Sequence, residues 1–286
     1  MVRLLRPRQW IKNGVVAAAL LFADRLSHPA SVIATAWAVL VFCAVSSGGY
    51  ILNDLVDAPN DRMHPLKKYR PIAAGQIRPG VALGLAISLL GLAIGASFAV
   101  RPAFMVVTAT YVLLTVAYSV ALKRVPVFDV VAVTGGFVIR AIAGAIAINV
   151  PVSIWLLLLT SLIAMFVILA KRLTDPAPTV LLGLRESYPA VWLRGAMVVV
   201  GIACLVSYLL YAVLASNLPS DHVMLLTVPF VAIGILRYAH LSGVIGTRRG
   251  PWITAAPDET LVRDQPLLLA VAGWAAMCVV ALYWIR

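Results

Sequence analysis

The chain has 286 residues, of which 62% are hydrophobic and only 12% are charged. Its 23 Lys and Arg residues against 11 Asp and Glu give a formal net charge of +12. A soluble domain carries about twice this share of charged residues, and a fold of this size could not bury so much apolar surface. The composition therefore excludes a disordered chain and an ordinary soluble enzyme, and it indicates an integral membrane protein. Its positive excess is typical of cytoplasmic loops, so no nucleic acid partner is expected.

Nine apolar runs predict nine transmembrane helices, because most runs approach the ~20 residues that cross the hydrocarbon core of a bilayer. In chain order the runs are 11–26, 30–57, 79–100, 102–121, 127–149, 152–171, 189–215, 221–239 and 266–285. The first run is the weakest, since Asn13, Asp24 and Arg25 shorten its apolar stretch. The expected fold is an all-α polytopic membrane bundle that forms a single domain over residues 1–286.

The positive residues are distributed unevenly between the two sides of the membrane. With a cytoplasmic amino terminus, most Lys and Arg residues fall in cytoplasmic segments, and only Arg25, Arg101 and Arg286 lie on the outer side. This asymmetry indicates a cytoplasmic amino terminus and an odd number of crossings. The expected location is the plasma (inner) membrane, with multiple passes. The long polar connections then also lie in the cytoplasm: 58–78, 172–188 and 240–265. Because loops carry function more often than the scaffold does, we expect the active site on this side.

The densest polar stretch follows the second predicted span. Asp54, Asp57 and Asp61, together with Asn53, fall within about 100° of arc when placed on a helix. Pro59 is expected to loosen the last turn, so that Asp61 lies just past the regular helix. Carboxylate and amide oxygens at this spacing suit Mg²⁺, which usually keeps several waters and bridges to substrate phosphates. We therefore expect these four oxygen-bearing residues to bind Mg²⁺ and to act in catalysis.

Basic residues follow the acidic ones directly, and we expect them to bind phosphate oxygens that the metal leaves uncovered. They are Arg62, Lys67, Lys68 and Arg70. The alternative is a solvated loop whose acids pair with its bases. Further polar residues at the same predicted membrane face are candidates for binding the phosphate of a lipid acceptor or of a donor. These are Gln9, Lys12, Lys123, Arg124, Lys171 and Arg172.

Arg140 lies inside the fifth predicted span, eleven residues or roughly 16 Å along a helix from Asp129. An arginine at that depth must contact a carboxylate, a backbone carbonyl or a substrate phosphate. Two interpretations stay open, a structural partnership with Asp129 or another acid, and direct contact with the substrate. Asp129 itself is expected to be a substrate-binding or ion-paired residue.

The acidic motif and its surroundings resemble the first signature of the UbiA-type intramembrane prenyltransferase superfamily. The matching residues are Asn53-Asp54-x-x-Asp57-x-x-x-Asp61, then Arg62, His64-Pro65, Lys67 and Arg70-Pro71-Ile72 as far as Gly75. The resemblance implies a nine-helix bundle with a cytoplasm-facing polar cavity, Mg²⁺, a substrate that bears a diphosphate, and a polyprenyl chain. Most members carry a second Asp-rich motif after the sixth span, where this sequence has Lys171-Arg172-Leu173-Thr174-Asp175.

The amino-terminal residues are similar to one branch of this superfamily, the decaprenyl-phosphate phosphoribosyltransferases. The match comprises Leu5-Arg6-Pro7-Arg8-Gln9-Trp10-Ile11-Lys12-Asn13, then Tyr118-Ser119, Leu122-Lys123-Arg124, Asp129, Gly135-Gly136-Phe137, Arg140 and Ala170-Lys171-Arg172. The resemblance implies a glycosyltransferase that moves 5-phosphoribose from phosphoribosyl pyrophosphate to a polyprenyl (decaprenyl) phosphate and releases pyrophosphate. Its product would be the lipid-linked precursor of the donor for cell-wall arabinan. Asn13 and Tyr118 then join the candidate substrate-binding residues.

Two other functions compete with this one. The first is a prenyltransferase that moves a polyprenyl group from its diphosphate to an aromatic, quinone or haem acceptor, but the second acidic pair that it needs is missing. The second is a transporter whose carboxylates carry ions. Transport sites lie near the bilayer midplane, whereas the charges here gather at one membrane face. The sequence leaves the prenyl length open, and it also leaves open whether the protein is a homo-oligomer.

Overall fold

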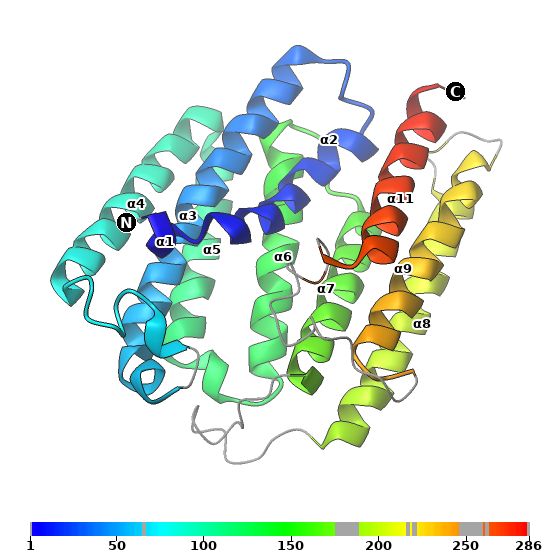
Figure 1. Cartoon of the computed structure of the whole chain (residues 1–286). Helices are drawn as coiled ribbons and strands as arrows, with labels where there is room; N and C mark the ends of the chain where they lie inside the picture. The colour runs from blue at the N-terminus through cyan, green and yellow to red at the C-terminus, as the bar shows by residue number, and fades with distance from the viewer. Residues whose placement is uncertain are drawn as a thin grey trace. The chain divides into compact units, whose positions relative to one another are not determined.

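The computed structural model describes residues 2–64, 67–174, 189–215, 218, 222–245, 260 and 263–284. Every regular element in these ranges is helical (Figure 1), and eight helices are long and apolar enough to cross a membrane. The chain is thus an all-α, multi-pass membrane protein. It divides into two compact units, which are considered separately. The first contains the described residues of 1–20 and 25–152, and the second contains those of 21–24, 153–176 and 188–286.

The prediction of a transmembrane helix over 11–26 is wrong. The amino-terminal segment forms three short elements, α1 (Val2–Leu5), the 3-10 helix η1 (Pro7–Ala17) and α2 (Ala18–Phe22). Arg6 separates the first two with a left-handed conformation (φ 50°, ψ 58°). Figure 1 shows this dark blue segment running across α3 (Pro29–Met63) rather than alongside it. The nine predicted spans therefore become eight within the described ranges, because the first apolar run never forms one continuous helix.

Helix α3 is much longer than a membrane span requires. Its 35 residues extend about 52 Å, whereas the hydrocarbon core is about 30 Å thick. The last third of α3, which carries the aspartates, can therefore lie outside the hydrocarbon core. The expectation that Asp61 lies past the helix is wrong, because α3 continues through Pro59 to Met63. An ion pair between Asp61 and Arg70 (2.7 Å) joins this last turn to the loop that follows.

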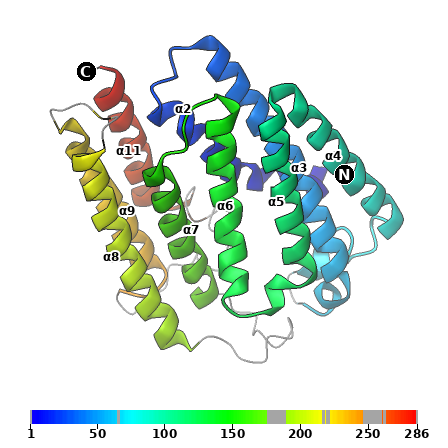
Figure 2. The ribbon, with the colours of Figure 1, turned by 180° about the vertical axis from the view of Figure 1, so that it is seen from behind.

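Three further spans complete the first unit. These are α4 (Pro79–Val100), α5 (Pro102–Val120) and α6 (Phe128–Ala147), joined by the short 3-10 helices η2 (Lys67–Tyr69) and η3 (Leu122–Arg124). Figure 2 shows α5 between α4 and α6. Proline near the first position of α3, α4 and α5 favours helix initiation, because its missing N–H has no intrahelical partner there.

The core of the first unit combines aromatic rings with one close helix contact. The ring of Phe42 packs 6.0 Å from that of Phe104 and 5.3 Å from that of Tyr111. A Cβ atom on Gly48 would lie 2.8 Å from Cγ of Leu90, so glycine is needed where α3 meets α4.

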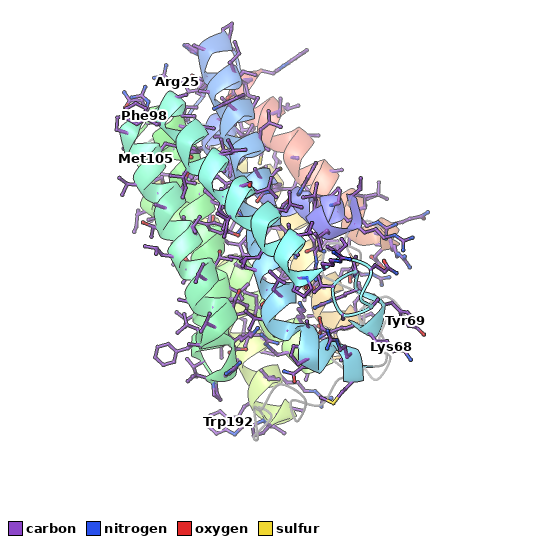
Figure 3. The ribbon with its side chains drawn as sticks, turned by 90° about the vertical axis from the view of Figure 1, so that its left-hand side faces the viewer. Arg25, Lys68, Tyr69, Phe98, Met105 and Trp192 are labelled. Atoms are coloured by element: carbon purple, nitrogen blue, oxygen red, sulfur yellow. The ribbon has the colours of Figure 1, made fainter. Side chains whose placement is uncertain are left out.

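Figure 3 shows the two ends of this unit, with Lys68 and Tyr69 at the end opposite to Arg25, Phe98 and Met105. The basic loop after α3 and the acidic end of α3 therefore lie at the same end of the unit.

The second unit contains α7 (Ile154–Thr174), α8 (Ala190–Leu214), η5 (Val223–Thr227), α9 (Val228–Leu241) and α11 (Gln265–Tyr283). All eight spans after the first agree with the predicted runs to within a few residues, except for the longer carboxyl-terminal end of α3. Buried hydrogen bonds link the helices of this unit, because the Tyr208 hydroxyl lies 2.6 Å from Thr227 Oγ1 and accepts from Trp274 Nε1 (2.8 Å). Most of the predicted loops 172–188 and 240–265, including Asp175, lie outside the described residues.

Asp264 joins two helices of the second unit at the start of α11. Its carboxylate accepts hydrogen bonds from Arg237 Nε (3.1 Å) and Nη2 (2.8 Å), and it caps α11 by accepting from the Leu267 amide (3.0 Å). The hydrogen bonds from Arg237 and then from Leu267 hold the pKa of Asp264 below its ordinary value. The charged form is therefore favoured in the folded state.

Asp264→Ala removes both the cap and the ion pair, so we expect it to lower the free energy of unfolding by about 1 kcal/mol. Asp264→Asn keeps a capping oxygen and should destabilise less. Because the pKa is lowered by folding, the stabilisation is present above the ordinary carboxyl pKa and is lost as the pH falls through the folded value. Thermal unfolding in detergent micelles measures both effects. A gap between wild type and Asp264→Asn that widens on acidification would contradict this account.

Candidate active site

The polar residues at the end of α3 share one helical face, as the sequence predicts. Arg70 Nη1 contacts both Asp54 Oδ1 (3.1 Å) and Asp61 Oδ2 (2.7 Å), although these aspartates are seven residues apart. On the neighbouring strip of the same face, Asn53 Nδ2 donates to Asp57 Oδ2 (2.9 Å). Asp54 and Asp61 are buried, with exposed fractions of 3% and 4%. The four side chains form two adjacent groups on one helical face, Asp54 with Asp61 and Asn53 with Asp57, and together they are called the acidic cluster.

Three cations from three different segments neutralise the acidic cluster. Arg6 Nη2 contacts Asp54 Oδ1 (2.5 Å), and Lys123 Nζ contacts Asp57 Oδ1 (2.5 Å) and Asn53 Oδ1 (3.2 Å). Arg70 is the third cation. Three carboxylates thus face three positive side chains, which offsets the cost of removing these charges from water.

Arg6 is the site residue that sequence reasoning missed, because that reasoning assigned phosphate binding on this segment to Gln9 and Lys12. The available signal was the Arg6-Pro7 pair, since a residue before proline is disfavoured in the helical conformation and breaks the helix. The left-handed backbone of Arg6 interrupts the segment at the point where its side chain reaches Asp54. Its guanidinium also lies 5.4 Å from the ring centroid of Tyr50, which adds a cation–π contact.

The other predicted residues of the first unit occupy different environments. Lys12 Nζ donates to Gln9 Oε1 on η1, whereas Asn13 is fully buried. Arg62 and Arg124 are exposed, and Lys67 and Tyr118 are half-buried. Asp129 is fully buried in the first turn of α6.

Arg140 is buried near the middle of α6, and its hydrogen bonds go to Asn13, Gly136 and Tyr111. Its observed partners are thus neutral groups rather than Asp129. Lys171 and Arg172 lie in the last turn of α7, in the second unit.

The acidic cluster offers oxygen ligands of the kind that Mg²⁺ prefers. In the described part of the chain, no group of three His, Cys, Asp or Glu side chains is arranged to enclose a metal ion. The oxygen donors of the cluster fit a magnesium ion that takes part of its coordination from protein carboxylates. The remaining positions would be filled by water and by substrate oxygens, which is the usual arrangement for Mg²⁺.

The described helices form an integral membrane protein with carboxylates and cations paired at one end of a long span. Comparison with known proteins identifies the family. The model of the UbiA prenyltransferase family matches residues 14–252. The chain therefore belongs to the UbiA prenyltransferase family, as its acidic motif indicates.

Relatives of known name cover nearly the whole chain. The decaprenyl-phosphate phosphoribosyltransferase of Corynebacterium glutamicum is 35% identical over 99% of this chain and 86% of its own length. The protein of the same name from Mycobacterium tuberculosis is 30% identical over 96% of this chain and 92% of its own length. Among solved structures, a UbiA homologue from Archaeoglobus fulgidus bound to DMAPP and Mg²⁺ has a TM-score of 0.76, with 18% identity and 99% of each chain covered. That likeness shows the shared fold.

The pairing of Lys123 with Asp57 can be tested by a double-mutant cycle. Removing one partner leaves the other charge poorly solvated, so Lys123→Met and Asp57→Asn should each lower the free energy of unfolding by about 2–3 kcal/mol. The double variant should lose less than the sum of the two, because no charge is then left unpaired. Thermal unfolding in detergent micelles provides the measurement. Arg124→Met, which removes the exposed neighbouring cation, is the matched control, and strict additivity would show that the pair does not interact.

Proposed function

We propose that this enzyme transfers 5-phosphoribose from phosphoribosyl pyrophosphate to a polyprenyl phosphate such as decaprenyl phosphate, with release of pyrophosphate. The names of the relatives that match nearly the whole chain support this assignment. The reaction would take place at the cytoplasmic face of the plasma (inner) membrane, where phosphoribosyl pyrophosphate is available. A later glycosyl-transfer pathway, such as cell-wall arabinan synthesis, would consume the lipid-linked product.

The observation that carries the proposal is the three cations arranged on the acidic cluster. Arg6, Arg70 and Lys123 pair with the carboxylates, so three positive side chains lie beside the residues proposed to bind Mg²⁺ and could contact the phosphates of the donor. Phosphoribosyl pyrophosphate carries one phosphate more than a prenyl diphosphate. The resemblance to the superfamily also implies a second acidic motif at the place where this sequence has Lys171-Arg172. Both features favour a more anionic donor over a prenyl diphosphate.

In the proposed reaction, an oxygen of the lipid phosphate attacks C1 of the ribose while the bond from C1 to pyrophosphate breaks. Positive charge develops on the ribose and negative charge on the leaving pyrophosphate. The lipid phosphate is already an anion, so no general base has to remove a proton from it. Arg6, Arg70 and Lys123 would bind and orient the donor phosphates, so that catalysis comes mainly from positioning and electrostatic stabilisation.

We further propose that Asn53, Asp54, Asp57 and Asp61 bind Mg²⁺ together with the donor. The solved UbiA homologues bound to Mg²⁺ and a prenyl diphosphate support a divalent ion in this family. When bound, Mg²⁺ would neutralise charge on the departing pyrophosphate. Around it, Gln9, Lys12, Arg62 and Lys67 would contribute to phosphate binding.

The assignment is tested with membranes that contain the protein, labelled phosphoribosyl pyrophosphate, polyprenyl phosphate and Mg²⁺. We expect a labelled, lipid-extractable phosphosugar and an equal amount of released pyrophosphate. The competing reaction is tested in parallel with labelled prenyl diphosphate and an aromatic acceptor. A prenylated aromatic product without any phosphosugar would show that the enzyme transfers a prenyl group and not phosphoribose.

Asp54→Ala and Asp57→Ala should each reduce phosphosugar formation at least roughly 100-fold, because each removes a carboxylate placed for the metal. Direct titration with Mn²⁺ as a spectroscopic probe should show weaker metal binding for both variants. Asp264→Asn, which alters an acid of the second unit, is the control and should keep both activity and metal binding. Unchanged Mn²⁺ binding in both alanine variants would show that the acidic cluster is not the metal site.

A further inference from the structure

Arg140 is a buried arginine in the membrane-spanning helix α6. Only 4% of its surface is exposed. Its guanidinium donates to Asn13 Oδ1 from Nε (2.8 Å), to the Gly136 carbonyl from Nη1 (3.0 Å) and to the Tyr111 hydroxyl from Nη2 (2.7 Å). The same group lies over the ring of Tyr111, 4.7 Å from its centroid. One side chain thus joins η1, α5 and α6.

These partners are neutral, so the arginine is not there to balance an acid. A buried charge is expensive, and three neutral acceptors with an aromatic face are a costly way to accommodate it. The planar guanidinium differs from other donors because it can reach acceptors in three directions at fixed angles. The forked arrangement of N–H donors on the guanidinium therefore explains why arginine occupies this position better than the positive charge of arginine does.

Asn13 is the partner that extends this network to α3. It is fully buried, and its Nδ2 donates to Cys43 Sγ (3.3 Å) and to Ser46 Oγ (3.2 Å) while its Oδ1 accepts from Arg140. Both amide hydrogens and the amide oxygen are thus engaged by the protein. Together, Asn13 and Arg140 fasten η1 between α3 and α6, and we call this pair the brace.

A second contact, independent of the brace, fixes η1 against α6. A Cβ atom on Gly144 would overlap the carbonyl oxygen of Val16, so the backbone of η1 packs directly on α6. Gly135 on the same helix has room, because a Cβ there would meet only Leu114 Cδ2 at an ordinary 3.5 Å. The backbone of η1 therefore comes this close to α6 at Gly144 and not at Gly135.

Such external support matters because of the conformation of η1. It is a 3-10 helix of 11 residues, whereas 3-10 helices longer than three or four residues are uncommon since their hydrogen bonds are poorly aligned. Tertiary contacts must then determine its position. Arg6 directly precedes η1, so the position of this helix decides where the Arg6 side chain meets Asp54.

We propose that Arg140 is a positioning residue, which acts through Asn13 to fix η1 so that Arg6 stays on Asp54 and Gln9 and Lys12 keep their places at the donor site. The part of this inference that concerns the donor rests on the proposed function. The structural part concerns η1 alone and can be measured without any substrate.

The test compares Arg140→Lys, Arg140→Gln and Gly144→Ala in lipid nanodiscs. Amide hydrogen exchange of residues 7–17 should become faster in all three variants. The KM for phosphoribosyl pyrophosphate should rise roughly tenfold or more, since small displacements of binding groups are costly, while kcat falls less. Arg140→Lys should behave like Arg140→Gln, because lysine keeps the charge but not the fork.

Two controls and one mild variant accompany these measurements. Gly135→Ala adds the same methyl group to α6 where there is room, and Thr108→Val removes a buried hydrogen bond between α4 and α5 (Ser97 Oγ to Thr108 Oγ1, 3.1 Å). Both should leave exchange and KM near wild type. Tyr111→Phe removes only one acceptor of Arg140 and should give a smaller effect in the same direction, which keeps the test decisive if the Arg140 variants fail to fold.

Three outcomes would overturn the inference. Unchanged exchange over 7–17 in Arg140→Lys, Tyr111→Phe and Gly144→Ala would show that the brace does not fix η1. Faster exchange with an unaltered KM would show that the position of η1 does not matter to the donor. Normal behaviour of Arg140→Lys beside a defective Arg140→Gln would assign the role to charge. If the protein transfers no phosphoribose at all, the exchange data still decide the structural part, so the two proposals fail separately.

Discussion

The structure of the first unit depends on the pairing of three aspartates at the end of α3 with Arg6, Arg70 and Lys123. Asp54 and Asp61 are buried and Asp57 is half-buried, so opposite charges are needed to offset the cost of removing them from water. The three cations come from the amino-terminal segment, from the loop after α3 and from the connection after α5. Each ion pair therefore fastens one of these segments to α3. The interaction that makes the site electrically neutral is also the one that assembles it.

The amino-terminal segment shows how the site and the membrane fold constrain each other. Its apolar residues suit a lipid environment, but Arg6, Lys12 and Asn13 need polar partners. The segment satisfies both requirements by crossing α3 as a broken chain of short helices (Figure 1) instead of forming a separate span. Asn13 then finds its partners on α3 and α6, and Arg6 finds Asp54.

The charge balance of the acidic cluster also relates the family to the proposed substrate. A polyphosphate brings more negative charge than one magnesium ion neutralises, so positive side chains at the site would help to balance the remainder. Arg6, Arg70 and Lys123 would then exchange carboxylate partners for phosphate oxygens at little electrostatic cost.

The sequence by itself determined the membrane class, eight of the spans and the face shared by Asn53, Asp54, Asp57 and Asp61. Apolar run length and helical period are local properties, so they can be measured along the chain. The tertiary structure alone decided that residues 11–26 do not span, that Pro59 does not end α3, and that Arg6 belongs to the site. It also decided that Arg140 meets Asn13, across 127 positions, rather than an acid. Partners so distant in sequence are chosen by helix packing, which no local pattern encodes.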